Sequence, residues 1–66
     1  MRYNDAQKEL IRRVVPHEIN FDKLSDDDYL DIEDHVGQHY TECVMDGNTS
    51  EADICEQILD NLDNME

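Results

Sequence analysis

Metal-ligand side chains recur every fourth residue in one stretch of the chain, namely Asp31, His35, His39 and Cys43. Residues four apart lie on one helix face, and carboxylate, imidazole and thiolate all bind zinc. The ladder spans about 18 Å at the helical rise of 1.5 Å per residue, so only two neighbours could share an ion, and a closed site needs a further element. We favour a structural role, with His39 and Cys43 at the core and His35 at the surface. The pair His35 and His39 is kept as the metal-binding alternative.

The sequence matches two known metal-binding motifs only in part. The segment His35–His39 has the histidine spacing of a zinc protease helix, but no Glu follows the first histidine to act as base. The segment Asp46–Ser50 begins like a calcium loop, yet Glu51 stands where that loop needs Gly, and Gln57 where it needs Glu. We therefore expect a turn between two helices here, with no protease activity and no calcium site.

The two cysteines, Cys43 and Cys55, fall near the facing ends of two expected helices and could approach each other across the turn. No apolar export signal occupies Met1–Asp5, and thiols in the cell interior stay reduced. Neither cysteine has a Lys or Arg nearby in sequence to activate it. We interpret both as buried thiols that pack as small apolar side chains, and we expect no enzyme activity and no cofactor.

Residues 1–66 predict one all-α domain of three helices with an ordered connector between the first two. The first helix is expected from residue 4 or 5 to Val15, because Pro16 then ends it. Its apolar face is formed by Tyr3, Gln7, Leu10, Ile11 and Val14. The connector, residues 16–24, contains the only Phe of the chain, Phe21, which we expect to be buried.

The second helix is expected from Ser25, a cap for the amide of Asp28, to about Met45, with Gly47 as a left-handed stop. One apolar stripe is formed by Tyr29, Ile32, Val36, Tyr40 and Cys43. A second stripe, at a seven-residue spacing, is formed by Leu30, Gly37 and Val44. Such a wide apolar arc predicts contact with two neighbours, helices one and three in a monomer, with a close helix crossing at Gly37.

The third helix is expected from Thr49 or Ser50, with Ser50 as a cap, to about Asp63. Its apolar face is formed by Ala52, Cys55, Ile58, Leu59 and Leu62. Its other side carries a row of acids, namely Asp53, Glu56, Asp60 and Asp63.

Charge is distributed very unevenly along the chain. Residues 1–23 contain all five Lys and Arg residues and four acids, whereas residues 24–66 contain fourteen acids and no Lys or Arg. The net charge of −13 repels nucleic acid and anionic lipid and attracts basic protein surfaces and divalent cations. We therefore expect no direct binding of nucleic acid and no membrane association.

The segments Leu24–Gly37, with its run Ser-Asp-Asp-Asp-Tyr-Leu-Asp-Ile-Glu-Asp-His, and Cys55–Leu62 resemble small acidic proteins of unknown function from Gram-positive bacteria and their phages. This resemblance covers part of the chain and implies no activity and no site residues. In size and charge the chain is also similar to bacteriocin immunity proteins and to phage inhibitors of host defence, but it lacks their motifs.

These observations favour a cytoplasmic module that binds a basic protein surface as an inhibitor, adaptor or regulator. A sharper version is a DNA mimic, in which carboxylates take the place of phosphates. The expected partner-binding residues are Asp27, Asp31, Asp34, Asp53, Glu56, Asp60 and Asp63. Two alternatives stay open, namely a metal-binding regulator that uses His35 and His39, and a homodimer with a seam of Leu30, Gly37 and Val44.

Overall fold

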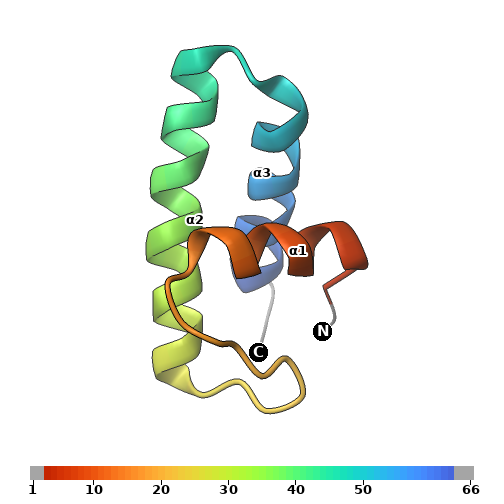
Figure 1. Cartoon of the computed structure of the whole chain (residues 1–66), viewed down its shortest axis with the longest axis vertical. Coiled ribbons are helices and arrows are strands. Elements are labelled where there is room, and N and C mark those ends of the chain that lie inside the picture. The colour runs from red at the N-terminus through yellow and green to blue at the C-terminus, as the bar shows by residue number, and fades with distance from the viewer. Residues whose placement is uncertain (1–2, 64–66) are drawn as a thin grey trace.

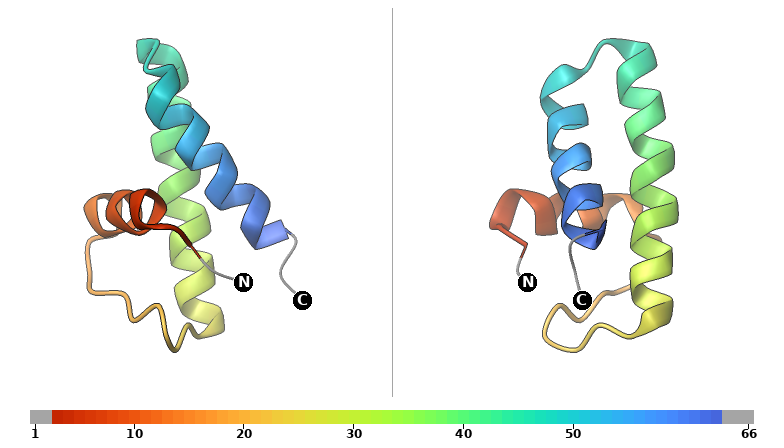
Figure 2. Two further views of the ribbon diagram at one scale, coloured as in Figure 1. Left: turned by 90° about the vertical axis from the view of Figure 1, so that its right-hand side faces the viewer. Right: turned by 180° about the vertical axis from the view of Figure 1, so that it is seen from behind.

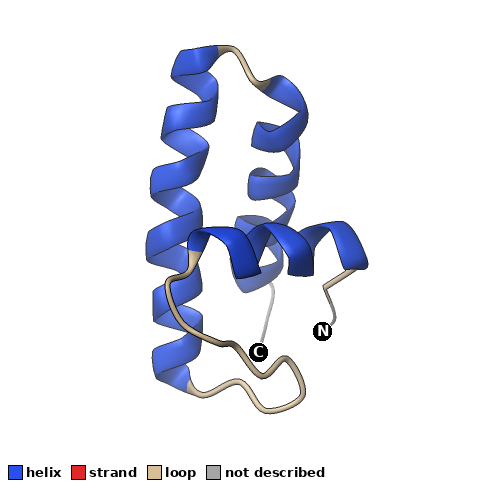
Figure 3. Ribbon diagram, in the orientation of Figure 1, coloured by secondary structure: helices blue, strands red, loops and turns tan. Residues whose placement is uncertain are grey.

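The computed structural model describes residues 3–63, and for Asp63 the backbone alone. It contains α1 (Asp5–Val14), α2 (Asp26–Asp46) and α3 (Thr49–Asp63), with no strand within that range. The predicted all-α domain of three helices is therefore confirmed. The two long helices form an antiparallel hairpin, and the short α1 crosses both of them on one side (Figures 1 and 3).

Side chains at the helix ends explain where the first two helices begin and stop. The side chain of Asn4 accepts from the backbone N–H of Gln7 at 2.8 Å, and Gln7 Oε1 accepts in return from the N–H of Asn4 at 3.1 Å. Ser25 and Asp28 form the same reciprocal pair at the start of α2, as predicted. Gly47 ends α2 with φ 78°, the left-handed conformation that favours glycine.

The core lies where the three helices and the connector converge. Side chains from all of these segments fill it, namely Tyr3, Leu10, Ile11, Val15, Ile19, Ile32, Val36, Cys55 and Ile58. These residues confirm the predicted inner faces of the three helices. Gln7 is the one buried polar side chain among the described residues, and its Nε2 donates to Gln57 Oε1 at 3.0 Å, which joins α1 to α3.

The prediction that Phe21 is buried is only partly right. Its ring lies at the edge of the core, packed edge-on against Tyr3 with 5.9 Å between centroids. The outer side of the ring is covered by Lys8 and Arg12, whose charged groups lie 5.7 and 5.3 Å from its centroid. Two cations on α1, rather than a helix face, therefore shield this ring, and cation–π attraction stabilises the arrangement.

The second apolar stripe of α2 is not covered by another helix, so that prediction is wrong. Leu30 is 61% exposed and Val44 is 54% exposed. A Cβ placed on Gly37 would meet no atom within 4 Å, so no helix crosses closely there. The reason is that α1 and α3 both pack on the opposite face of α2, which carries Ile32 and Val36 (Figure 2).

None of the helices within residues 3–63 has the length and apolar character needed to cross a membrane.

Candidate functional site

The turn between α2 and α3 is fixed by Asn48, which aligns the facing side chains of the two helices. Its backbone N–H donates to the carbonyl of Cys43 at 2.8 Å. Its side-chain oxygen accepts from the N–H of Glu51 at 3.4 Å, and its amide donates to Glu51 Oε2 at 3.1 Å. Asn48, rather than the predicted Ser50, therefore caps α3 and orients the Glu51 carboxylate.

Glu51 is the point at which all three helices are joined by polar contacts. Its Oε1 accepts from His39 Nε2 of α2 at 2.9 Å and from Arg13 Nη2 of α1 at 2.9 Å. The side chain is 22% exposed. The hydrogen bond from His39 is the largest of the effects that lower the pKa of Glu51, so its carboxylate is held in the charged form.

Beside Glu51, a histidine and two cysteines meet at the interface of α2 and α3. His39 and Cys43 lie one turn apart on α2, and Cys55 faces them from α3. One potential ligand atom of each lies within 4.8 Å of those of the other two. Both cysteines are free and buried, and the imidazole is 26% exposed. The geometry therefore brings a nitrogen and two sulfur ligands together without a disulfide.

The two thiols are held in the protonated form by their surroundings. Burial, followed by the proximity of Cys43, raises the pKa of Cys55 to about 11. Burial is also the main cause of the raised pKa of Cys43, and the nearby Glu51 carboxylate adds to it. Because the thiolate is the nucleophilic form, neither cysteine of the metal-free protein is primed for covalent chemistry.

The two histidines of the predicted metal pair have different hydrogen-bond partners. His35 Nδ1 donates to the backbone carbonyl of Asp31 at 2.8 Å, and His35 is not part of the group formed by His39, Cys43 and Cys55. The imidazole is partly buried rather than fully exposed. The expected approach of Cys55 to Cys43 is found, but its grouping with His39 and the contact of Glu51 were missed because Cys55 and Glu51 come from another helix. The sequence could have indicated this group, because Cys55 lies on the predicted inner face of the third helix and His39 and Cys43 are four residues apart on the helix that faces it.

Six of the seven predicted acidic residues have described side chains, and these lie on the outer sides of α2 and α3. Five of the seven are exposed and have no ion pair among the described residues, namely Asp27, Asp34, Asp53, Glu56 and Asp60. Asp31 differs, because its Oδ2 lies 2.8 Å from His17 Nε2 of the connector. The side chain of Asp63 lies outside the described residues.

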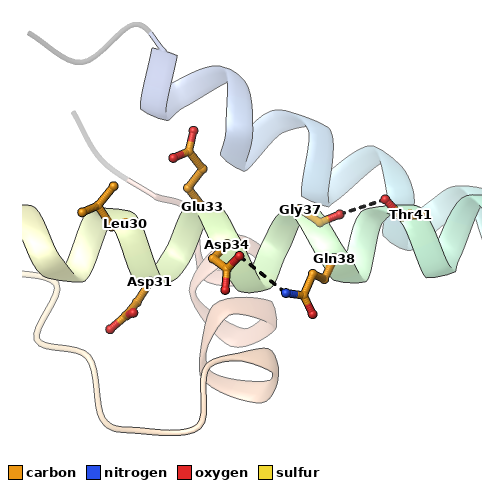
Figure 4. Close-up of a pocket in the computed structure, with 7 residues that line it drawn as sticks. All are labelled: Leu30, Asp31, Glu33, Asp34, Gly37, Gln38 and Thr41. Carbon is orange, nitrogen blue, oxygen red and sulfur yellow. Dashed lines mark hydrogen bonds between the residues drawn. The ribbon is translucent and has the colours of Figure 1, made fainter.

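A shallow, open hollow runs along the outer face of α2 (Figure 4). It is lined by Leu30, Asp31, Glu33, Asp34, Gly37, Gln38 and Thr41. Thr41 Oγ1 donates to the carbonyl of Gly37 at 3.2 Å, and Gln38 Nε2 donates to Asp34 Oδ1 at 3.5 Å. The hollow combines an exposed apolar side chain with carboxylates, and it suits an extended or helical partner rather than an enclosed small molecule.

Comparison with protein-family models, with curated proteins and with solved structures finds no match for this chain.

The contact between His17 and Asp31 predicts a pH-dependent stability. The hydrogen bond that His17 donates to Asp31 is the largest cause of the raised pKa of His17, followed by its hydrogen bond to the carbonyl of Glu18, and the charge of Asp28 adds to both. A raised folded-state pKa contributes stability below the ordinary value of 6.5 that is lost as pH rises through the folded-state value. His17→Asn should therefore lower the free energy of unfolding near pH 5.5 and leave it unchanged near pH 8.

Urea unfolding of the wild type and the variant at both pH values measures this difference. In an Asp31→Asn background the pH-dependent part should become much smaller, because the imidazolium has lost its carboxylate partner and keeps only the Glu18 carbonyl and the charge of Asp28. An equal loss at both pH values would instead assign His17 a packing role.

Proposed function

We propose that the protein is an acidic interaction module that binds a basic, partly apolar segment of a partner protein along the outer face of α2. In this role it acts as an inhibitor, adaptor or regulator. The observation that carries the proposal is the position of Leu30 and Val44, which are exposed on a helix face bordered by Glu33 and Asp34, two carboxylates that form no ion pair within residues 3–63.

The charge of α2 and α3 supports a cationic partner. The chain supplies no Lys or Arg beyond Lys23, and three of the basic side chains on α1 already have partners. Arg13 contacts Glu51, while Lys8 and Arg12 cover Phe21. Like charges three or four residues apart on a helix repel by a few tenths of a kcal/mol per pair. A basic partner would remove this repulsion on binding.

The apolar residues of this surface form a row along the axis of α2. Leu30, Gly37 and Val44 follow one another at seven-residue intervals along α2, over about 21 Å at the helical rise. Gly37 has no side chain, which leaves the hollow open next to Leu30. An amphipathic helix with apolar anchors and flanking Lys or Arg residues fits a surface of this kind.

Two related functions are less well supported. A DNA mimic presents carboxylates in place of phosphates, and the rows on α2 and α3 supply them, but exposed Leu30 and Val44 between the acids favour a partner that also offers apolar side chains. A homodimer through the seam of Leu30, Gly37 and Val44 would bring Glu33 and Asp34 of both copies together. Such like-charge contacts oppose self-association.

The experiment compares proteins captured from extracts of the native host by the wild-type chain and by a Leu30→Ser variant, with identification by mass spectrometry. Segments of each captured protein are then tested for direct binding as synthetic peptides. We expect an amphipathic segment, with apolar residues at helical spacing and flanking basic residues, that binds the wild type and binds Leu30→Ser more weakly. A partner segment bound equally by both chains would contradict the role of the outer face of α2.

A further inference from the structure

We propose that His39, Cys43 and Cys55 form a binding site for one thiophilic divalent metal ion of the zinc type at the interface of α2 and α3. This site goes beyond the interaction surface, because it lies on the inner side of α2 and uses none of the residues of the outer face.

The spacing of the ligand atoms suits a tetrahedral ion. In such a site two sulfur ligands at about 2.3 Å from the metal lie about 3.8 Å apart. The potential ligand atoms of His39, Cys43 and Cys55 already lie within 4.8 Å of one another. These separations exceed the spacing in a tetrahedral site by at most about 1 Å, a difference that side-chain rotation would close. Two cysteines and a histidine favour zinc over hard cations such as magnesium or calcium.

The backbone around these ligands is well fixed, as a metal site requires. His39 and Cys43 lie on the same face of α2, one turn apart. Cys55 belongs to α3, and the bond from Asn48 to the Cys43 carbonyl sets how the two helices align. The further element that the helical ladder lacked is therefore supplied by α3.

Glu51 is the positioning residue of the site. Its carboxylate accepts from His39 Nε2, which leaves Nδ1 as the imidazole nitrogen without a hydrogen bond among the described residues. A carboxylate on one imidazole nitrogen commonly fixes the ring when the other nitrogen binds a metal. Arg13 in turn holds the Glu51 carboxylate.

The charges of the occupied site would balance. On binding, each thiol would release its proton to solvent, the two thiolates would neutralise one divalent ion, and Arg13 neutralises Glu51. Because buried charge is tolerated only when it is paired, this balance allows a metal ion in a region where Cys55 is fully buried. The exposed acids elsewhere attract cations only diffusely and offer no sulfur ligand.

The test titrates the full chain, reduced and metal-free, with Co²⁺ and then with Zn²⁺. We expect one Co²⁺ per chain, a near-ultraviolet thiolate-to-cobalt charge-transfer band, the visible bands of tetrahedral cobalt, and displacement by an equal amount of Zn²⁺. Cys43→Ser and Cys55→Ser should each weaken the charge-transfer band. Their loss of Zn²⁺ affinity should exceed the roughly 10–100-fold that removal of an outer partner costs.

Three further variants separate this site from its competitors. His39→Asn alters a side chain that is not part of the core, so it should fold normally and lose Zn²⁺ affinity. Glu51→Gln should bind Zn²⁺ with roughly 10–100-fold lower affinity and keep the thiolate-to-cobalt charge-transfer band. His35→Asn, one turn away on α2, is the matched control and should bind as the wild type does.

Circular dichroism of each metal-free variant confirms that it is folded. Binding of several weak ions that is abolished by salt and equal in all variants would overturn the proposal. So would loss of binding in His35→Asn together with full binding in Cys55→Ser, because the ion would then use the histidine pair.

Discussion

Leu10→Ala should lower the free energy of unfolding by about 2–5 kcal/mol, whereas Leu30→Ala should leave it nearly unchanged. Both variants remove the same atoms from a helix. Leu10 is fully buried at the contact of α1 with the rest of the core, and Leu30 is 61% exposed. Truncating a buried Leu to Ala costs about 2–5 kcal/mol. A domain of this length has a total stability of about 3–10 kcal/mol, so this loss removes a large part of it.

Urea unfolding followed by circular dichroism measures both variants at several protein concentrations. The cost of Leu30→Ala should stay within about 0.5 kcal/mol, as for other exposed positions. If Leu30→Ala instead costs as much as Leu10→Ala, and the cost depends on protein concentration, the outer face of α2 is covered by a second copy. The homodimer alternative would then replace the partner surface.

Addition of Zn²⁺ should raise the melting temperature strongly. An ion that binds the folded state alone stabilises it by about 4 kcal/mol when its free concentration is a thousand times the dissociation constant. In a domain of this size each kcal/mol shifts the melting temperature by about 4–8 °C, so the expected rise is roughly 15–30 °C. The ion binds the folded state alone because folding brings its ligands on α2 and α3 together.

The thermal experiment has a matched set of controls in the chain. The shift should be absent in Cys55→Ser and in His39→Asn, and complete in His35→Asn. Mg²⁺ at the same ionic strength should produce only the small stabilisation that comes from screening the acids. A Mg²⁺ shift as large as the Zn²⁺ shift would mean that the ions act on the acidic surface and not at the thiols.

Local features of the fold could be predicted from the sequence because they depend on residues close in the chain. Ser25 and Asp28 cap each other over one turn, and Gly47 adopts the positive φ that ends α2. The inner faces of the helices follow from helical periodicity, which identified the buried Ile32 and Ile58.

Features that depend on how the helices dock could not be predicted in the same way. Periodicity located the stripe of Leu30 and Val44 but could not reveal that α1 and α3 share the opposite face of α2. The exposure of Phe21 depends on the docking of α1 against the connector, which places the side chains of Lys8 and Arg12 over the ring.

The same distinction between local features and helix docking applies to the candidate sites. Exposed acids at Asp27, Asp34, Asp53, Glu56 and Asp60 follow from helix periodicity alone. The group of His39, Cys43 and Cys55 depends on a contact between helices, so the spacing along α2 suggested the neighbouring His35 as the second ligand. The pairing of Asp31 with His17 links the connector to α2, and no local pattern indicates it.

The central claim, that a basic and partly apolar segment binds the outer face of α2, is tested most directly by one affinity series. The dissociation constant of the captured partner segment is measured for the wild type, Leu30→Ser, Asp34→Asn and Asp60→Asn, each at 0.01 M and 0.15 M salt. Asp34 lines the hollow on α2, and Asp60 is an equally exposed acid on α3.

Leu30→Ser should weaken binding about tenfold at both salt concentrations, because an apolar anchor contributes on the order of 1–2 kcal/mol that salt does not screen. Asp34→Asn should weaken binding more than Asp60→Asn at 0.01 M salt, and this difference should shrink at 0.15 M, where the Debye length falls from about 30 Å to about 8 Å. Equal effects of Asp34→Asn and Asp60→Asn, with no effect of Leu30→Ser, would contradict the account and would indicate attraction to the net charge alone.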